Sequence, residues 1–232
     1  MKISAIQKLT LLDYPGRMAC TVFTPGCNFR CPFCHNALLV LPEMQQGDEL
    51  SCEEVLSFLK KRTGILEGIC LTGGEPLLQS GVDDFLRRVK DLGYAVKLDT
   101  NGSFPDRLEA LISAGLVDKV AMDIKNSPEL YALTVGLPAF DIAPVERSKE
   151  LLLSGVVDYE FRTTVVKGIH TAQSLTEAAK WIHGAKDYYL QQFKDSGNLI
   201  ASAGLSAYSE EEMKALSEAI RPYVENVHLR GI

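Results

Sequence analysis

The chain lacks both a long hydrophobic run and a block of basic residues. No stretch of its 232 residues approaches the roughly 20 apolar residues that a membrane-spanning helix needs. Polar residues interrupt positions 1–6 too early for the apolar region of a signal peptide. The longest basic run is Lys60-Lys61-Arg62, and the formal net charge is -6. We therefore expect a cytoplasmic protein with no general affinity for membranes or nucleic acid.

Internal repeats, low-complexity linkers and a second group of cysteines are also missing. The composition, 46% hydrophobic and 23% charged, is that of an ordinary soluble chain, and glycines and prolines are scattered between short elements. We expect one domain over residues 1–232, with no auxiliary cluster domain. Of the six cysteines, Cys20 and Cys70 lie in apolar runs and are expected as small buried hydrophobes, and Cys52 begins a helix. A chain of this size needs no disulfide framework.

The other three cysteines are concentrated in the loop 25–36, at Cys27, Cys31 and Cys34. Thiolates select zinc, Cu(I) or iron-sulfur clusters, and structural zinc normally has four protein ligands. Three thiolates without a fourth indicate an open metal position for substrate or cofactor. Two alternatives stay open on spacing alone: a zinc knuckle completed by His35 or a distant residue, and three reduced loop thiols.

A second motif, Gly73-Gly74-Glu75-Pro76, follows the apolar run 68–71 and precedes a helical pattern. Paired glycines at a strand-to-helix turn let backbone approach a ligand closely, and Glu75 places a carboxylate there that can accept hydrogen bonds from an ammonium group. Taken alone, the motif would be an ordinary turn.

Strand and helix patterns alternate along the chain. A hairpin turning at residues 14–16 precedes six expected strands, at 19–24, 68–71, 94–98, 119–124, 159–165 and 188–191. The expected helices cover 51–61, 82–91, 105–114, 144–153, 172–184 and 208–221, and Ser51 with Glu54 predicts a capping box. Alternation implies parallel strands with right-handed crossovers, and six units are too few for a closed eight-stranded barrel. We predict an α/β fold, an open six-unit (β/α)6 partial barrel with a short N-terminal hairpin.

The two motifs together resemble the signature of radical S-adenosylmethionine enzymes, Cys-x3-Cys-x-aromatic-Cys followed by a Gly-Gly-Glu-Pro strand end. The resemblance covers nearly the whole chain and implies the same partial barrel. It implies that Cys27, Cys31 and Cys34 bind three irons of one 4Fe-4S cluster, with Phe33 in the aromatic position. The fourth iron would bind the amino and carboxylate groups of S-adenosylmethionine. Gly73, Gly74 and Glu75 would hold the methionyl ammonium.

Further candidate residues lie where strands end, the edge at which parallel barrels gather ligands. By resemblance, Asp99, Thr100 and Asp123 would help hold a monovalent cation near the cofactor carboxylate, although residues 99–102 also suit a turn or helix cap. Either Arg162 and Thr164 or Phe161 and Thr163 line the interior. Gln191 and Gln192 are candidates for contact with the methionyl or adenosine part of the cofactor. Lys125 is a candidate for contact with the substrate. His170, His183 and His228 are expected as surface or capping residues. Lys194 stands where a related activating enzyme has an aromatic-histidine pair.

Two more stretches narrow the resemblance. His35-Asn36 is similar to activating enzymes of glycyl-radical proteins, and residues 6–16 resemble activating proteins of anaerobic ribonucleoside-triphosphate reductase. The resemblance implies an oxidoreductase that cleaves S-adenosylmethionine reductively and installs a glycyl radical on a partner. The implied partners are the large subunit of anaerobic ribonucleotide reductase and an electron donor such as flavodoxin or ferredoxin. No acid or base side chain is required, and the sequence shows no nucleophile-histidine-carboxylate arrangement.

Two other functions compete with this reading. One is a small-molecule radical enzyme such as 7-carboxy-7-deazaguanine synthase, which has a similar length and the same cofactor motifs. The other is a non-catalytic zinc-binding interaction module, which would leave the Gly-Gly-Glu-Pro motif and the alternating pattern unexplained.

Overall fold

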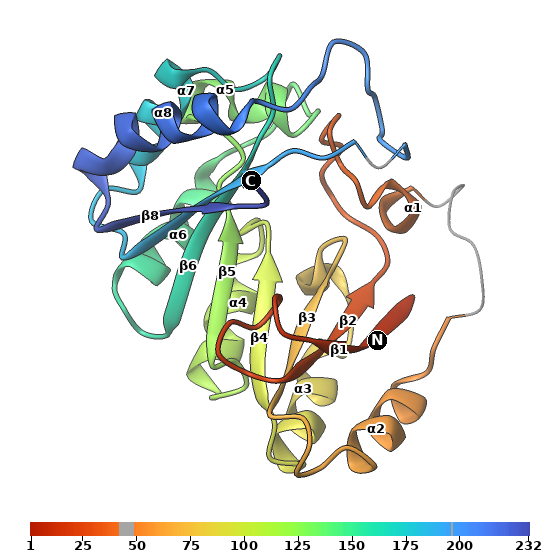
Figure 1. Ribbon diagram of the computed structural model, residues 1–232. Coiled ribbons are helices and arrows are strands. Elements are labelled where there is room, and N and C mark those ends of the chain that lie inside the picture. Colours follow the sequence, from red (N-terminus) through yellow and green to blue (C-terminus); the bar gives the residue numbers. More distant parts are fainter. Residues whose placement is uncertain (42–48, 196) are drawn as a thin grey trace.

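Eight strands lie in the sheet in the order in which they occur in the chain, and the curved sheet does not close (Figure 1). The computed structural model describes residues 1–41, 49–195 and 197–232. The first strand pairs antiparallel with the second, and every later pair is parallel. The strands are β1 Ala5–Thr10, β2 Ala19–Thr24, β3 Gly68–Gly73, β4 Ala95–Thr100, β5 Lys119–Asp123, β6 Asp158–Val165, β7 Asp187–Gln192 and β8 Asn226–Arg230.

Helices fill the connections between the parallel strands and cover the outer face of the sheet (Figure 1). Their N-termini are set by local chemistry, as at Ser51, whose side chain accepts the N–H of Glu54 in the expected capping box. None of the helices in the described ranges is long and apolar enough to cross a membrane. The helices are α1 Ala37–Val40, α2 Cys52–Lys60, α3 Val82–Asp91, α4 Pro105–Ser113, α5 Pro128–Thr134, α6 Ala143–Leu153, α7 Ala172–Trp181 and α8 Glu210–Ile220.

The six expected parallel strands and the N-terminal hairpin are confirmed. The hairpin turns where expected, with the Arg17 N–H donating to the Tyr14 carbonyl at 3.1 Å and Gly16 at φ 81°. Within the described ranges, two α-helices and one strand were missed, α1, α5 and β8, as were the short 3-10 helices Pro76–Leu78 and Arg221–Tyr223. The first two have four and seven residues, too few to show a helical period. Strand β8 is only partly buried along its length, so its sequence carries a weak hydrophobic signal.

The sheet has an apolar outer face and a polar inner face, because successive side chains of a strand point to opposite sides. Outward residues such as Leu71, Leu98 and Phe161 are fully buried under the helices. The inward residues next to them, Thr72, Asp99 and Arg162, line a cavity instead. Cys20 and Cys70 are fully buried, as expected. The chemistry of the chain is therefore concentrated inside the barrel.

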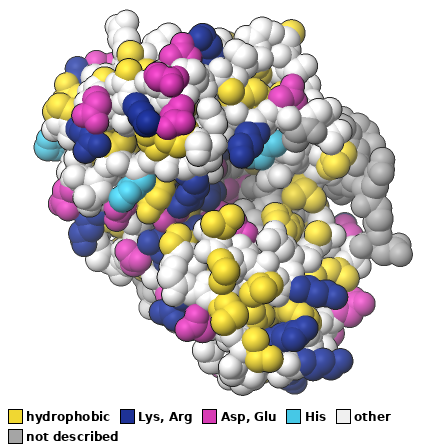
Figure 2. All heavy atoms as spheres, in the orientation of Figure 1, with side chains coloured by type: hydrophobic (Ala, Val, Ile, Leu, Met, Phe, Trp, Pro, Cys, Tyr) yellow, Lys and Arg dark blue, Asp and Glu magenta, His cyan; other side chains and the backbone are white. Residues whose placement is uncertain are grey.

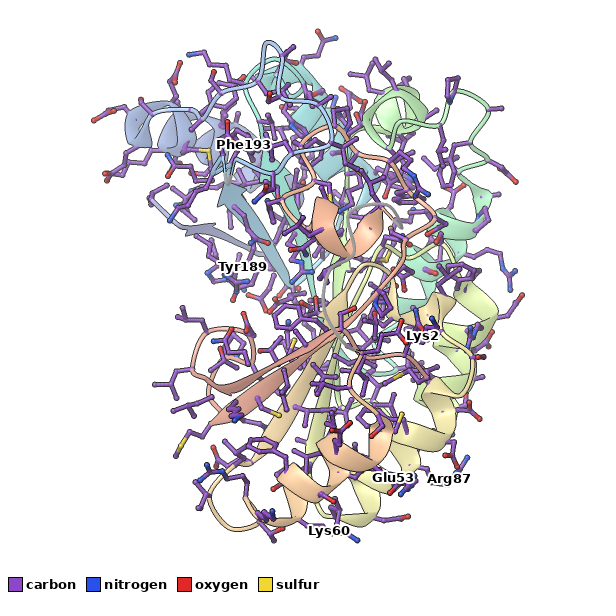
Figure 3. All side chains as sticks on the ribbon, turned by 90° about the vertical axis from the view of Figure 1, so that its right-hand side faces the viewer. Lys2, Glu53, Lys60, Arg87, Tyr189 and Phe193 are labelled. Atoms are coloured by element: carbon purple, nitrogen blue, oxygen red, sulfur yellow. The ribbon has the colours of Figure 1, made fainter. Side chains whose placement is uncertain are left out.

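Ion pairs on the outer surface tie helices together away from this interior. Arg88 of α3 forms a two-point pair with Glu53 of α2, at 2.6 and 2.8 Å. Figure 3 shows Glu53 and Arg87 close together at this surface, far from Tyr189 of β7 and from Phe193 just beyond that strand. These charges serve packing between helices.

Candidate functional site

The cysteine loop leaves β2 and is held in place by hydrogen bonds to two other segments. The Gly26 N–H donates to the Leu39 carbonyl at 2.7 Å, and the Arg30 N–H donates to the Val135 carbonyl at 2.8 Å. The Arg30 guanidinium turns back and donates to the carbonyls of Cys27 and Phe29, at 2.6 and 2.8 Å. The chain's own contacts thus fix the shape of the loop.

All three loop cysteines line one cavity of about 290 Å³ at the carboxyl ends of the strands. This volume is close to the lower end of the range for small-molecule sites, about 300 Å³. Phe33 is buried against the edge of the His170 ring, with centroids 6.0 Å apart. Burial raises the pKa of Cys27 to about 11 and that of Cys31 to about 12, so these thiols keep their protons until metal displaces them.

The donor set of the loop fits a 4Fe-4S cluster by its chemistry, because three cysteine sulfurs line one cavity and thiolates are the usual ligands of such clusters. Among the described residues, no group of three or more His, Cys, Asp or Glu side chains is arranged to hold a metal ion. The assignment of Cys27, Cys31 and Cys34 as cluster ligands stays a prediction.

The paired glycines pack against the start of the cysteine loop. A Cβ atom on Gly73 would lie 2.3 Å from the Thr24 carbonyl oxygen, and one on Gly74 would lie 1.8 Å from the Gly26 carbonyl oxygen. Gly73 also has a φ of 121°, which side chains rarely allow. The Gly74 and Glu75 N–H groups donate to the carbonyls of Thr24 and Gly26, at 2.9 and 2.8 Å. The glycine pair thus allows close packing on the loop, and because both glycines also line the cavity, their predicted contact with a methionyl ammonium stays a prediction.

Glu75 is fully buried and does not line the cavity. Its carboxylate accepts three protein hydrogen bonds: from the N–H groups of Leu77 at 2.9 Å and Asn101 at 2.7 Å, and from the Thr100 hydroxyl at 2.9 Å. Burial raises its pKa to about 7 despite these donors. Glu75 here joins the end of β3 to the end of β4, and its contact with a methionyl ammonium stays a prediction.

Three asparagines organise the loop, and sequence reasoning gave none of them a separate structural role. Asn36 donates to the Gly73 carbonyl at 3.2 Å, which ties the end of the loop to the glycine pair. Asn101 donates to the Asn28 side-chain oxygen at 2.9 Å and to the Cys27 sulfur at 3.7 Å. Asn28 in turn donates to Ser103 at 2.9 Å. Hydrogen bonds to cluster sulfurs tune reduction potential, so Asn101 is well placed to affect Cys27.

A chain of alternating charges runs through the cavity wall. Arg162 donates to Asp99 at 2.8 Å and to Asp123 at 2.6 Å, while Lys97 pairs with Asp99 at 2.6 Å and Lys125 with Asp123 at 2.8 Å. Burial alone would raise the pKa of each aspartate, but Arg162 and the lysines outweigh it and hold both pKa values below their ordinary range. Burial would lower the pKa of Lys125, but the Asp123 carboxylate outweighs it and holds that pKa above its ordinary range. All five groups are therefore charged near neutral pH.

The remaining predicted residues divide into those that line the cavity and those that do not. Gly73, Gly74, Thr100, Thr164 and Gln191 line it together with Asp99, Asp123, Lys125 and Arg162. Phe161 and Thr163 are buried on the outer face, and Gln192 donates to the Tyr208 carbonyl at 2.8 Å. The predicted monovalent cation stays a prediction, since Arg162 already neutralises Asp99 and Asp123 here.

The histidines required one correction. His170, expected at the surface or as a cap, is buried: its Nδ1 accepts the Val166 N–H at 3.0 Å, and its Nε2 lies 2.8 Å from the Lys125 carbonyl. It thereby braces the segment after β5, a tertiary role that its sequence neighbours do not signal. His183 and Lys194 are exposed, and the partly buried His228 pairs with Asp187 at 2.6 Å.

Comparison with known families gives one match, to the Radical SAM superfamily model over residues 21–152. A protein of Methanocaldococcus jannaschii that is provisionally named a glycyl-radical enzyme activating enzyme is 31% identical over 238 residues, which covers 99% of this chain and 96% of the relative. The pyruvate formate-lyase-activating enzyme of Clostridium pasteurianum is 33% identical over 133 residues, 54% of this chain and 52% of that one.

Two further proteins are similar to this chain. The first is named for a different activity, and the second shares the fold at low sequence identity. A protein of Halobacterium salinarum provisionally named a GTP 3',8-cyclase is 38% identical over 116 residues, but this chain spans only 32% of its length. The crystal structure of Streptococcus suis SuiB bound to precursor peptide SuiA superposes with a TM-score of 0.70 at 12% identity, over 91% of this chain and 48% of SuiB. The last likeness shows the fold alone.

We expect Cys31→Ala to abolish assembly of a 4Fe-4S cluster, because each loop thiol would supply one of only three protein ligands in the predicted site. Iron and sulfide analysis after anaerobic reconstitution measures this. The matched control is Cys20→Ala, fully buried on β2 and outside the cavity, which should keep the cluster and change mainly packing. Undiminished iron and sulfide in the Cys31 variant would show that the ligand assignment is wrong.

Gly74→Ala should disturb the cluster loop as well as cofactor binding, because its Cβ cannot fit against the Gly26 backbone. Overpacking of this kind costs about 1–3 kcal/mol of the free energy of unfolding, measured by urea denaturation, and iron content should fall in parallel. Gly115→Ala is the comparison: its methyl group meets open space, so its cost comes only from a φ of 66°, a strain that Gly74 does not have, and its iron content should match that of wild type. A Gly74 variant with a full cluster and only weaker S-adenosylmethionine binding would contradict this explanation.

Glu75→Gln should change how stability depends on pH. The folded chain holds the Glu75 proton up to about pH 7, whereas the ordinary carboxyl loses it near 4.5. This contribution to the free energy of unfolding is therefore fully present below about 4.5 and is lost as the pH rises through about 7. The free energy of unfolding of wild type minus that of the variant, measured by urea denaturation, should decrease over that pH window and be constant above it. Exposed Glu109→Gln is the control, and parallel curves for wild type and the Glu75 variant would refute the prediction.

Proposed function

The chain belongs to the radical S-adenosylmethionine superfamily, and from that premise we propose that it installs a glycyl radical on a partner protein. The observation that carries this proposal is the full-length likeness to the Methanocaldococcus jannaschii relative, which covers 99% of this chain. The cavity alone would serve many members of the superfamily. The His35-Asn36 extension lies on the cavity wall and agrees with the same assignment.

The bound groups would supply the radical chemistry, and the chain would supply ligation, position and exclusion of water. When bound, a 4Fe-4S cluster that receives one electron from a reductant would supply reductive cleavage of S-adenosylmethionine and so a radical able to abstract hydrogen from a glycine α carbon. Cys27, Cys31 and Cys34 would hold the cluster. Arg162 and Lys125 present cationic groups on the same wall and are suited to a carboxylate. Their ion pairs with Asp99 and Asp123 hold both cations in position before any ligand arrives.

The proposed partner is the large subunit of anaerobic ribonucleotide reductase, with a flavodoxin or ferredoxin as electron donor. This choice rests on the N-terminal run 6–16 and on the His35-Asn36 pair. A radical of this reactivity attacks whatever lies closest, so the cavity must admit a peptide loop and exclude other groups.

A small-molecule radical enzyme is the competing proposal, and the Halobacterium salinarum relative supports it over 46% of this chain. The likeness is confined to a third of that relative's length, which is why we rank it second. Family membership leaves no support for the non-catalytic zinc module.

Electron paramagnetic resonance tests the proposal directly. The reconstituted protein, reductant and S-adenosylmethionine should produce a glycyl-radical signal on the reductase large subunit. Deuterium at the target glycine's α carbon should alter the signal, and the Cys31→Ala protein should give none. Cofactor cleavage without that signal, accompanied by consumption of GTP or of a pterin substrate, would transfer the assignment to the small-molecule alternative.

A further inference from the structure

The hairpin between β1 and β2 exposes an unusual concentration of large apolar side chains. Leu9 is 53% exposed, Leu11 67%, Leu12 81% and Met18 39%; we call these four residues the hairpin patch. Single exposed leucines are common on protein surfaces, but a contiguous group indicates an interaction site. Figure 2 shows hydrophobic side chains gathered below the central hollow, over the region of this hairpin.

The patch is held in a defined shape. The Thr10 hydroxyl accepts the N–H groups of Leu12 and Asp13, at 3.2 and 3.1 Å, and the Asp13 carboxylate accepts the Thr21 hydroxyl at 2.5 Å. Tyr14 is buried, and the Met18 N–H donates to Glu67 at 2.8 Å. The leucines are therefore presented outward by a fixed turn, which lowers the entropy cost of binding to them.

The patch also lies beside residues of the cavity. The hairpin turns at the amino end of β2, where Thr10 pairs with Ala19, and its residues Gln7 and Asp13 line the cavity together with Arg162 and Gln191. Any macromolecule whose backbone enters the cavity on this side must lie next to the patch. The four patch residues do not line the cavity themselves, but they share the hairpin with Gln7 and Asp13, which do, whereas no residue of α5 lines it.

The charges around the patch further restrict the kind of partner surface that can bind there. Lys8 and Arg17 of the hairpin are exposed, whereas Lys2 pairs with Glu49 at 2.9 Å. The two acidic side chains at the patch are engaged: Asp13 accepts the Thr21 hydroxyl, and Glu67 accepts the Met18 N–H. A complementary surface is apolar at its centre and acidic at its rim.

We propose that the hairpin patch is the docking surface for the polypeptide partner that delivers its glycine to the cavity. The inference rests on the proposed function and deepens it, because it assigns partner recognition to a surface separate from the cofactor-binding wall. Burying the patch would align a partner loop with the side of the cavity that Gln7 and Asp13 form.

The double variant Leu11→Ser/Leu12→Ser tests the proposal, with Leu133→Ser, 75% exposed, as the matched control. All proteins are reconstituted anaerobically, and the probe is the large subunit of anaerobic ribonucleotide reductase. We expect the double variant to bind the subunit at least about tenfold more weakly and to form the glycyl radical correspondingly more slowly at low subunit concentration. Its S-adenosylmethionine cleavage without the subunit should equal that of wild type. The Leu133 variant should match wild type in all three measurements.

Three outcomes overturn the docking proposal while leaving the proposed function intact, provided that wild type forms the radical. The first is unchanged affinity of the double variant for the subunit. The second is an equal loss of subunit affinity in the Leu133 control. The third is that the double variant no longer self-associates, as measured by sedimentation, while its subunit affinity is unchanged. The last outcome would assign the patch to a second copy of the chain. If wild type cleaves S-adenosylmethionine but forms no radical on the subunit, the proposed function fails, and the docking proposal fails with it.

Discussion

The close packing of Gly73 and Gly74 on the backbone of Thr24 and Gly26 is the constraint on which the site depends. The distances leave no room for a side chain, and the hydrogen bonds between the two segments repeat at 2.8 and 2.9 Å. Because the cysteine loop begins at this contact, the position of Cys27 relative to the sheet is set by backbone atoms. Backbone contacts of this kind have little rotamer freedom and hold a site more precisely than long side chains do.

The same contact extends to the next strand through Glu75. Its carboxylate joins the turn after β3 to Thr100 and Asn101 at the end of β4, and Asn101 reaches back to Cys27 and Asn28. The cysteine loop, the glycine pair and the end of β4 thus form one hydrogen-bonded unit. A buried carboxylate with three donors is costly to disrupt, since removing it leaves the donors unsatisfied.

The interior charges solve a different problem from that of the loop. Buried charges are unfavourable unless they are paired, and the alternation Lys97, Asp99, Arg162, Asp123, Lys125 gives each one an oppositely charged neighbour. The result is a polar wall of paired charges inside the barrel. The docking proposal assigns recognition of a macromolecule to the apolar hairpin, whose residues Gln7 and Asp13 also line the cavity.

By itself, the sequence determined the alternation of strands and helices, the open barrel and the common location of the cysteines and the glycine pair, because these follow from short-range patterns. The period of a strand and the spacing of the loop cysteines are visible in the sequence without knowing which segments become neighbours in the fold. Only the tertiary structure decided the contacts of Glu75, Asn101 and His170, because their partners are distant in the sequence. Glu75 lies 26 residues from Asn101, Asn101 lies 74 residues from Cys27, and His170 lies 45 residues from Lys125. The tertiary structure also decided that the glycines meet the loop backbone, that Arg162 bridges Asp99 and Asp123, and that β8 forms. Each of these depends on which strands become neighbours, and that is set by packing of the whole sheet.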